Sequence, residues 1–334
     1  MKKIIDSPYA NGKAELMHET SNETFRKEVF KVRKYFYKCK KTGKEFTTSE
    51  AGDLNIIQIF NMYRERKKIL FPEQIIEMRE RYGLSAAKMS VVLGFGANTY
   101  SNYEKGEIPN DSNSTLLNQA YKPKGFLSII KEKEDLFSEK QIQTLCNRIE
   151  EIIIQRKSFC LRDYLFSDNT KPTEFTGYKM PNFEKIENAV IYFLQNPYTY
   201  ITRLNKLLFY SDFLSFSETG YSITGLRYAA IDNGPVPNNY NLLYSILEKE
   251  GAVNCDNVVM KDYEFSKYEP LKKFDKEIFE SEEIEIFKRV LRNFKFEKTS
   301  NIINLSHEEE GWKKNIKTKG LISYKEYGFE LKAF

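Results

Sequence analysis

The sequence has few of the residues that build metal sites and disulfide frameworks. Its 334 residues include two histidines and four cysteines, and no two cysteines form a C-x-x-C pair. A structural zinc site needs four closely grouped cysteine or histidine ligands, and disulfide-stapled domains show regular cysteine spacing in much shorter chains. We therefore expect no metal, no cofactor and no disulfide framework.

Membrane-spanning runs and catalytic signatures are also missing. No apolar stretch approaches the roughly 20 residues that a helix needs to cross a bilayer, and the N-terminus lacks the apolar core of a signal peptide. P-loop, G-x-S-x-G and H-E-x-x-H motifs are absent. Asp212, Asp232 and His307 are candidates for an acid/base set, but nothing in the sequence places them together. We expect a cytoplasmic protein that is not an enzyme and contacts no membrane.

Charge is abundant and unevenly distributed. The chain has a net charge of +5, with 30% charged and 41% hydrophobic residues, and its length favours two or three domains. The stretch from Val29 to Lys44 carries seven basic residues and no acidic one. Such a basic region suits contacts with nucleic-acid phosphates. A solvated basic hairpin, kept from pairing with other strands by its lysines, explains it equally well.

Residues 71–109 predict a helix-turn-helix. Pro72 suits the first turn of a helix that ends at Gly83, and Ser85 is placed to cap a second, short helix. Gly94 to Gly96 form a tight turn, and a third helix is predicted from Ala97 to Lys105. A three-helix unit with a polar surface that binds nothing is the alternative.

The predicted third helix has an inner and an outer face. Tyr100 and Tyr103 are three residues apart and face inward, whereas the Asn98 and Asn102 amides project together, where each can reach an adenine edge in a major groove. The predicted DNA-binding residues are Asn98, Thr99, Ser101, Asn102, Lys105 and, on the second helix, Lys88.

Residues 30–122 resemble MqsA-like antitoxins with their Xre-type helix-turn-helix. The resemblance is carried by S-A-A-K-M at 85–89, G-F-G at 94–96 and Y-x-x-Y-E-K-G at 100–106. It implies that Asn98 and Asn102 read DNA bases, although the second position is commonly arginine in the family. MqsA-type proteins usually carry two C-x-x-C pairs in the amino-terminal domain. Because Cys39 stands alone here, the resemblance implies a version of this domain without zinc.

The remaining chain is predicted to be mostly helical. Expected elements are antiparallel strands within 13–48 with a hairpin turn at 41–44, a helix ending near Lys67, helices within 126–157, an amphipathic helix within 201–220, a strand at 258–265, and helices at 183–194, 240–250, 281–294 and 300–307. The basic residues near Lys67, Arg64 among them, either complement the helix dipole or touch DNA. The expected fold class is α+β, mainly helical. Its expected domains are a small β-rich domain (1–68), a helix-turn-helix (69–122), a helical connector (123–182) that dimerises or packs on the last domain, and a mostly helical C-terminal domain (183–334).

Residues 183–330 resemble the SocA-like antitoxin domain, also called Panacea. The carrying segments are L-N-K-L-L-F-Y-S-D at 204–212, T-G-L at 224–226 with Tyr228, G-P-V-P at 234–237, and His307 to Trp312. The resemblance implies a domain that binds a protein toxin. Together the two resemblances imply a type II antitoxin that neutralises a cognate toxin and, as a homodimer, represses its own operon by binding operator DNA.

Candidate residues for the toxin contact surround a stiff turn at 233–237. The predicted partner-binding residues are Asp212, Tyr228, Asn233, Pro235, Tyr240 and Trp312. Tyr228 and Tyr240 are expected as exposed anchors, with a core position as the alternative for either, and Lys206 and Asp212 as a buried pair or a partner contact. On this interpretation residues 183–334 alone suffice to neutralise the toxin. The alternative function is a phage or mobile-element transcriptional regulator, or a proteolytic adaptor, with a partner other than a toxin.

Overall fold

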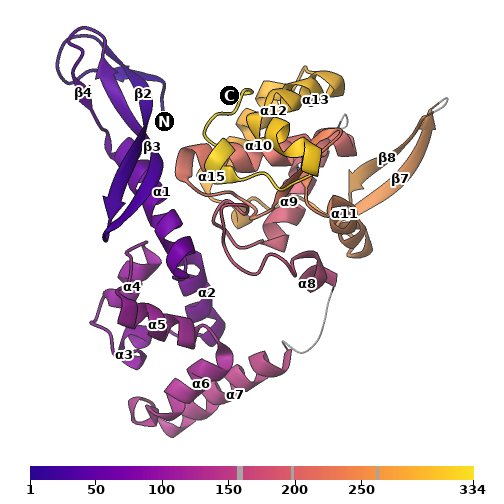
Figure 1. Ribbon diagram of the computed structural model, residues 1–334. Coiled ribbons are helices and arrows are strands. Elements are labelled where there is room, and N and C mark those ends of the chain that lie inside the picture. The colour runs from indigo at the N-terminus through magenta and orange to yellow at the C-terminus, as the bar shows by residue number, and fades with distance from the viewer. Residues whose placement is uncertain (156–160, 197–198, 261–262) are drawn as a thin grey trace. The chain divides into compact units, whose positions relative to one another are not determined.

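A computed structural model describes residues 1–155, 161–196, 199–260 and 263–334 (Figure 1). Helices make up most of it, together with a small N-terminal antiparallel sheet, which confirms the predicted α+β, mainly helical class. The chain forms two compact units, one of residues 1–59 with 165–334 and one of residues 60–164. No helix among the described residues is both long and apolar enough to cross a membrane.

The N-terminal sheet contains four antiparallel strands in sequence order. They are β1 (Ile4–Asp6), β2 (Lys13–Phe25), β3 (Glu28–Cys39) and β4 (Glu45–Phe46). Arg26 and Lys27 both have positive φ and form the two-residue turn between the long strands, as right-handed strand twist favours. The predicted turn at 41–44 joins β3 to β4, with the Gly43 amide donating to the Cys39 carbonyl at 2.8 Å.

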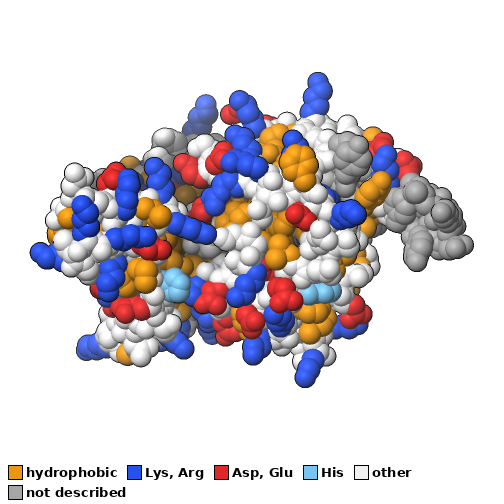
Figure 2. Space-filling model, turned by 90° about the horizontal axis from the view of Figure 1, so that it is seen from above, with side chains coloured by type: hydrophobic (Ala, Val, Ile, Leu, Met, Phe, Trp, Pro, Cys, Tyr) orange, Lys and Arg blue, Asp and Glu red, His pale blue; other side chains and the backbone are white. Residues whose placement is uncertain are grey.

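Several basic side chains of this sheet lie beside carboxylates. Lys38 pairs with Glu45 at 3.1 Å, and Lys40 pairs with Glu15 at 3.0 Å. In Figure 2 lysine and arginine side chains stand among acidic and apolar ones on the visible face. Exposed pairs of this kind contribute little stability, but they reduce the charge available to a nucleic acid.

Helix α1 (Ser49–Lys67) satisfies backbone groups of β3 that pair with no strand. The Asn55 side chain accepts from the Tyr35 amide at 2.8 Å and donates to the Tyr35 carbonyl at 2.9 Å. Gln58 makes the same pair of hydrogen bonds with the backbone of Arg33, at 3.0 and 2.8 Å. These amides cover an edge that would otherwise be open to another strand.

The unit of residues 60–164 begins with helices at the predicted positions. They are α2 (Pro72–Tyr82), α3 (Ala86–Val92) and α4 (Thr99–Glu104), followed by α5 (Asp111–Ala120), α6 (Pro123–Lys131) and α7 (Glu139–Gln155). The Ser85 hydroxyl accepts from the Lys88 amide at 3.1 Å, so it caps α3 as predicted. Gly83 ends α2 with φ at 69°. Helix α4 begins at Thr99 rather than Ala97, with Asn98 at its N-cap.

Helices α6 and α7 share one core with α2, α3 and α4, so they do not form a separate connector. Phe126 and Ile130 are fully buried, and Leu145 and Ile149 close the core from α7. The rings of Phe126 and Tyr82 stack with their centroids 4.1 Å apart. Residues 123–155 therefore stabilise the predicted helix-turn-helix segment directly.

The other unit contains α9 (Phe183–Leu194), α10 (Ile201–Thr219), α11 (Tyr240–Lys249), α12 (Ser281–Phe294), α13 (Thr299–Glu308), α14 (Glu310–Asn315) and α15 (Tyr324–Tyr327). Strands β5 (Tyr228–Ile231) and β6 (Gly234–Pro237) form one hairpin, and β7 (Val253–Met260) and β8 (Tyr263–Pro270) form another. The short helix α8 (Leu161–Leu165) lies at the boundary of the two units.

Three predictions for this region are wrong in detail. The strand expected at 258–265 spans two strands, and the part of it at 261–262 lies outside the described residues. The stiff turn at 233–237 is mostly strand β6, because the chain turns earlier, at Asp232 and Asn233. Helix α10 is not amphipathic, since every side chain from Arg203 to Phe216 is buried.

The turn-rich segment at 167–182 lies inside its unit instead of separating two domains. Asn169, Thr176 and Tyr178 are buried, and the Ser222 hydroxyl donates to the Thr176 carbonyl at 2.7 Å. A fragment that starts at residue 183 would remove these contacts. The N-terminal sheet is tied to the same unit, since Arg33 forms an ion pair with Glu330 and donates to the Phe329 carbonyl at 2.7 Å.

The packing of α6 against α2 predicts a large effect for Phe126→Ala. Removing a fully buried phenylalanine should lower the free energy of unfolding by about 3–5 kcal/mol, because a cavity replaces the stacked ring. Ser128→Ala, on the exposed face of α6, should change it by less than about 0.5 kcal/mol. Denaturant unfolding gives the magnitude, and hydrogen exchange should place the loss within residues 60–164. Unchanged exchange in α2 would show that α6 packs independently.

Candidate functional site

Two tyrosines fix α4 to the rest of its unit. The Tyr100 hydroxyl donates to the Ile75 carbonyl at 2.8 Å, and its amide donates to the Ser90 hydroxyl at 3.2 Å. The Tyr103 hydroxyl accepts from the Asn113 side chain at 2.7 Å. Burial raises the pKa of Tyr100 well above its usual value, so the hydroxyl stays neutral. Both rings face inward, as predicted, and they set the rotation of α4 about its axis.

The outward side chains of α4 form a small polar surface. Asn98, Asn102 and Lys105 are exposed, and Thr99 and Ser101 are partly exposed. The Asn102 amide donates to the Asn98 carbonyl at 3.0 Å, so the two asparagines remain one helical turn apart although Asn98 precedes the helix. This surface has amide and hydroxyl groups and one cation, which are the groups that read base edges and touch phosphates.

Lys88 does not belong to this surface. Its ammonium donates to the Leu136 carbonyl at 2.6 Å and lies 4.0 Å from the centre of the Phe137 ring. The prediction that Lys88 contacts DNA with α4 is therefore not supported by its position. The sequence pattern placed Lys88 on an exposed helix, but it did not indicate that Leu136 and Phe137, just before α7, contact its ammonium group.

Arg64 is a support for the end of α4. Its side chain is 1% exposed and donates to the Gly106 carbonyl at 2.6 Å, and its guanidinium carbon lies 5.8 Å from the ring centres of both Phe60 and Phe71. Arg64 lies in the last turn of α1, where it can complement the helix dipole as predicted, and its burial leaves it no access to DNA. Arg64 holds the chain where α4 ends, at Gly106, whose φ of 101° is one that glycine adopts without strain.

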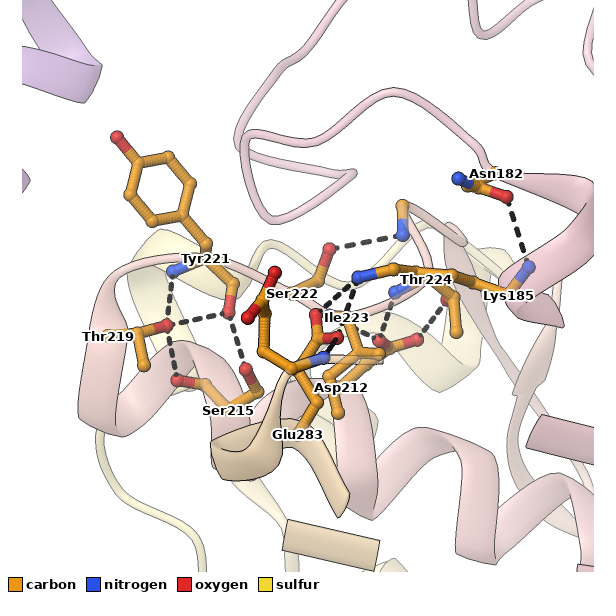
Figure 3. A network of polar contacts seen from close by, with 12 residues as sticks. Asn182, Lys185, Asp212, Ser215, Thr219, Tyr221, Ser222, Ile223, Thr224 and Glu283 are labelled. Atoms are coloured by element: carbon orange, nitrogen blue, oxygen red, sulfur yellow. Dashed lines mark hydrogen bonds and ion pairs between the residues drawn. The ribbon is translucent and has the colours of Figure 1, made fainter. Parts of the chain in front are cut away.

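Asp212 organises the loop that follows α10 (Figure 3). One carboxylate oxygen accepts from the amides of Ile223 and Thr224, each at 2.8 Å. The other accepts from the Thr224 hydroxyl and, at 2.8 Å, from the Tyr228 hydroxyl. Asp212 is fully buried, and this desolvation raises its pKa to about 6 against the lowering effect of its donors. Its four hydrogen bonds identify Asp212 as a structural residue.

Lys206, which lies on α10 like Asp212, holds strand β6 in place. Its ammonium donates to the Pro235 carbonyl at 2.8 Å, and burial lowers its pKa to about 7. Gly234 makes this approach possible, since a Cβ there would lie 2.7 Å from Lys206 Cε and 2.3 Å from the Ser306 hydroxyl. Lys206 and Asp212 therefore have separate hydrogen-bond partners and do not form the pair considered from the sequence.

The predicted partner-binding residues separate into buried and exposed groups. Asp212, Tyr228 and Pro235 are buried, so the expectation that Tyr228 is an exposed anchor is wrong. The hydrogen bond to Asp212 explains why that tyrosine points inward. Asn233 is exposed at the hairpin turn, and Tyr240 is partly exposed at the start of α11.

Trp312 is partly buried and also has a structural contact. Its indole nitrogen donates to the Ile231 carbonyl at 2.8 Å, and its ring stacks on His307 with centroids 3.9 Å apart. Trp312 and His307 thus lie together at the end of β5. Among the residues that the structure describes, no group of three His, Cys, Asp or Glu side chains is arranged to hold a metal ion.

Sequence reasoning missed an exposed aromatic residue in the turn between α12 and α13. Phe296 is 90% exposed. Buried Arg203 holds this turn, because its guanidinium donates to the Phe294 carbonyl at 2.6 Å and to the Glu297 carbonyl at 2.8 Å. The segment F-K-F-E-K at 294–298 contains one buried and one exposed phenylalanine. Their spacing of two residues was the only sign in the sequence that one of them faces solvent.

Residues 204–313 match the family model described as the SocA-like antitoxin, Panacea domain. This confirms the SocA-like resemblance for that part of the chain, about one third of its length. The matched part is similar to antitoxin domains, which are not typically enzymes, and this points to a role related to toxin–antitoxin systems. A comparison with curated proteins finds no match.

The burial of Lys206 predicts a specific dependence of stability on pH. Its pKa is lower in the folded state, about 7, than its usual 10.5, so the folded protein should gain stability as pH rises from 7 toward 10 and lose it again as pH falls. Lys206→Met removes this titration. The difference in unfolding free energy between the native protein and this variant should therefore change by up to ~1.4 kcal/mol per pH unit in favour of the native protein.

Lys249→Met, at an exposed position of α11, serves as the control and should give a difference that is flat over the same pH range. Urea unfolding at several pH values measures both differences. Parallel stability profiles for the native protein and Lys206→Met would contradict a depressed lysine pKa.

Proposed function

We propose that this protein is the antitoxin of a two-gene toxin–antitoxin system. Its C-terminal part would bind and neutralise a cognate protein toxin, and residues 69–122 would act as a helix-turn-helix that binds operator DNA as a homodimer and represses the pair's own promoter. The match of residues 204–313 to an antitoxin domain is the observation that carries the proposal. The exposed asparagines of α4 support its DNA-binding part.

Three residues of the C-terminal part are the proposed toxin contacts. Asn233 and Phe296 are exposed, and Tyr240 is partly exposed. Asn233 and Phe296 lie on turns that are fixed by a buried group, Lys206 for the β5–β6 hairpin and Arg203 for the turn at 294–297, and Tyr240 lies at the start of α11. Preformed segments lose less conformational entropy on binding, and aromatic side chains dominate binding energy at interfaces.

The DNA-binding role predicts that Asn98→Ala with Asn102→Ala abolishes sequence discrimination. Each lost base contact should reduce discrimination by about 1–3 kcal/mol, while contacts with phosphates preserve weak, salt-dependent binding to any DNA. Gel-shift titrations with the upstream region and a scrambled duplex measure this ratio. Asn118→Ala, outside α4, is the control. A double variant that still discriminates as the native protein does would refute base reading by α4.

The toxin-binding role predicts separable defects. In full-length protein, Phe296→Ala or the pair Asn233→Arg and Tyr240→Ala should lose rescue of growth when co-expressed with the product of the neighbouring gene, yet retain operator binding. Asn98→Ala with Asn102→Ala should show the reverse. Glu282→Gln, an exposed change at the start of α12, should leave both functions intact. Loss of toxin binding through changes confined to residues 1–59, with none of these C-terminal variants affected, would place the toxin on the N-terminal sheet.

A further inference from the structure

A cavity of about 540 Å³ lies between the α2–α3 turn and the first half of α7. Its volume falls within the range of small-molecule sites. Apolar groups line part of it, namely buried Tyr82 and Leu145 with partly buried Leu84 and Phe137. All of these residues belong to the unit of residues 60–164, and neither the DNA-binding nor the toxin-binding proposal uses the cavity.

The charged side chains that line the cavity are all cationic. They are Lys88, Lys140 and Arg148. Elsewhere on α2, Arg79 and Arg81 pair with Glu104 and Glu77. The three cations of the cavity have no carboxylate within 4.0 Å in the part of the chain that the structure describes. None of the three forms an ion pair with a described residue, so the cavity favours an anion.

Neutral carbonyl groups hold two of these cations at the wall. Lys88 donates to the Leu136 carbonyl, and Arg148 donates to the Arg81 carbonyl at 2.8 Å and to the Glu80 carbonyl at 3.2 Å. Gly83 permits the position of Arg148, because a Cβ there would lie 2.5 Å from its guanidinium. The cations are thereby positioned without losing their formal charge.

Two capping serines add hydroxyl donors to the same lining. The Ser85 hydroxyl accepts from the Lys88 amide, and the Ser138 hydroxyl accepts from the Gln141 amide at 3.4 Å. Each hydroxyl keeps its own proton for a further acceptor. The lining therefore offers hydroxyl donors and positive charge together with apolar side chains, and the two kinds of group adjoin where the Lys88 ammonium lies over the Phe137 ring.

We propose that this cavity binds a small organic anion made of a flat apolar body and a phosphate group. The phosphate would meet Lys88, Lys140 and the serine hydroxyls, and the flat body would lie against the partly exposed Leu84 and Phe137 side chains. Neither half of such a ligand satisfies the whole lining. The complete molecule should therefore bind more tightly than either half alone.

Titration calorimetry with 1-naphthyl phosphate tests the proposal on the full chain without DNA. We expect saturable binding at least tenfold tighter than that of 1-naphthol or inorganic phosphate. Thr144→Trp, which places an indole in the cavity from an exposed position of α7, should reduce affinity at least tenfold without changing net charge. Lys140→Gln should weaken binding of 1-naphthyl phosphate but not of 1-naphthol.

Lys124→Gln removes one exposed charge from α6 outside the cavity and should leave affinity unchanged. Circular dichroism verifies that each variant remains folded. No binding by the native protein, equal binding by Thr144→Trp, or equal weakening by Lys124→Gln and Lys140→Gln would each overturn the proposal. The last result would indicate attraction by net charge alone.

Discussion

Helix α10 has no solvent-facing side from Arg203 to Phe216, and most of the C-terminal fold follows from this constraint. A fully buried helix that carries an arginine, a lysine and an aspartate must find partners for all three, because an unpaired buried charge costs several kcal/mol. Each charged side chain forms hydrogen bonds with backbone groups of a different segment. Arg203 bonds to the turn at 294–297, Lys206 to strand β6, and Asp212 to the loop at 222–224.

This arrangement assigns different roles to residues that look alike in sequence. The polar residues of the L-N-K-L-L-F-Y-S-D segment at 204–212 are buried. Two of them, Lys206 and Asp212, hold neighbouring segments in place through hydrogen bonds to their backbone. In contrast, the hairpin held by Lys206 exposes Asn233, and the turn held by Arg203, which precedes this segment, exposes Phe296. The proposed toxin contacts therefore lie outside the 204–212 segment, which carries part of the family resemblance.

Elements governed by local signals were predictable from sequence, and exposure was not. Pro72, Gly83 and Ser85 act within one helical turn, so α2 and α3 begin and end where predicted. Helices α9 and α12 also have their predicted bounds. Whether Tyr228 or Lys88 faces solvent depends on Asp212 and on the Leu136 carbonyl, which lie 16 and 48 residues away in the chain. No periodicity within a single helix or strand contains that information.

The pairing of residues 1–59 with 165–334 has a consequence for synthesis on the ribosome. The N-terminal strands are made first, yet Arg33 must wait for Phe329 and Glu330 before its contacts exist. At roughly 5–20 residues per second that wait lasts about a quarter of a minute to a minute. Residues 60–164, whose core is local, are complete long before. A nascent chain would therefore carry a folded middle between two unfinished ends, and during this interval its N-terminal sheet would depend on α1 alone to cover β3.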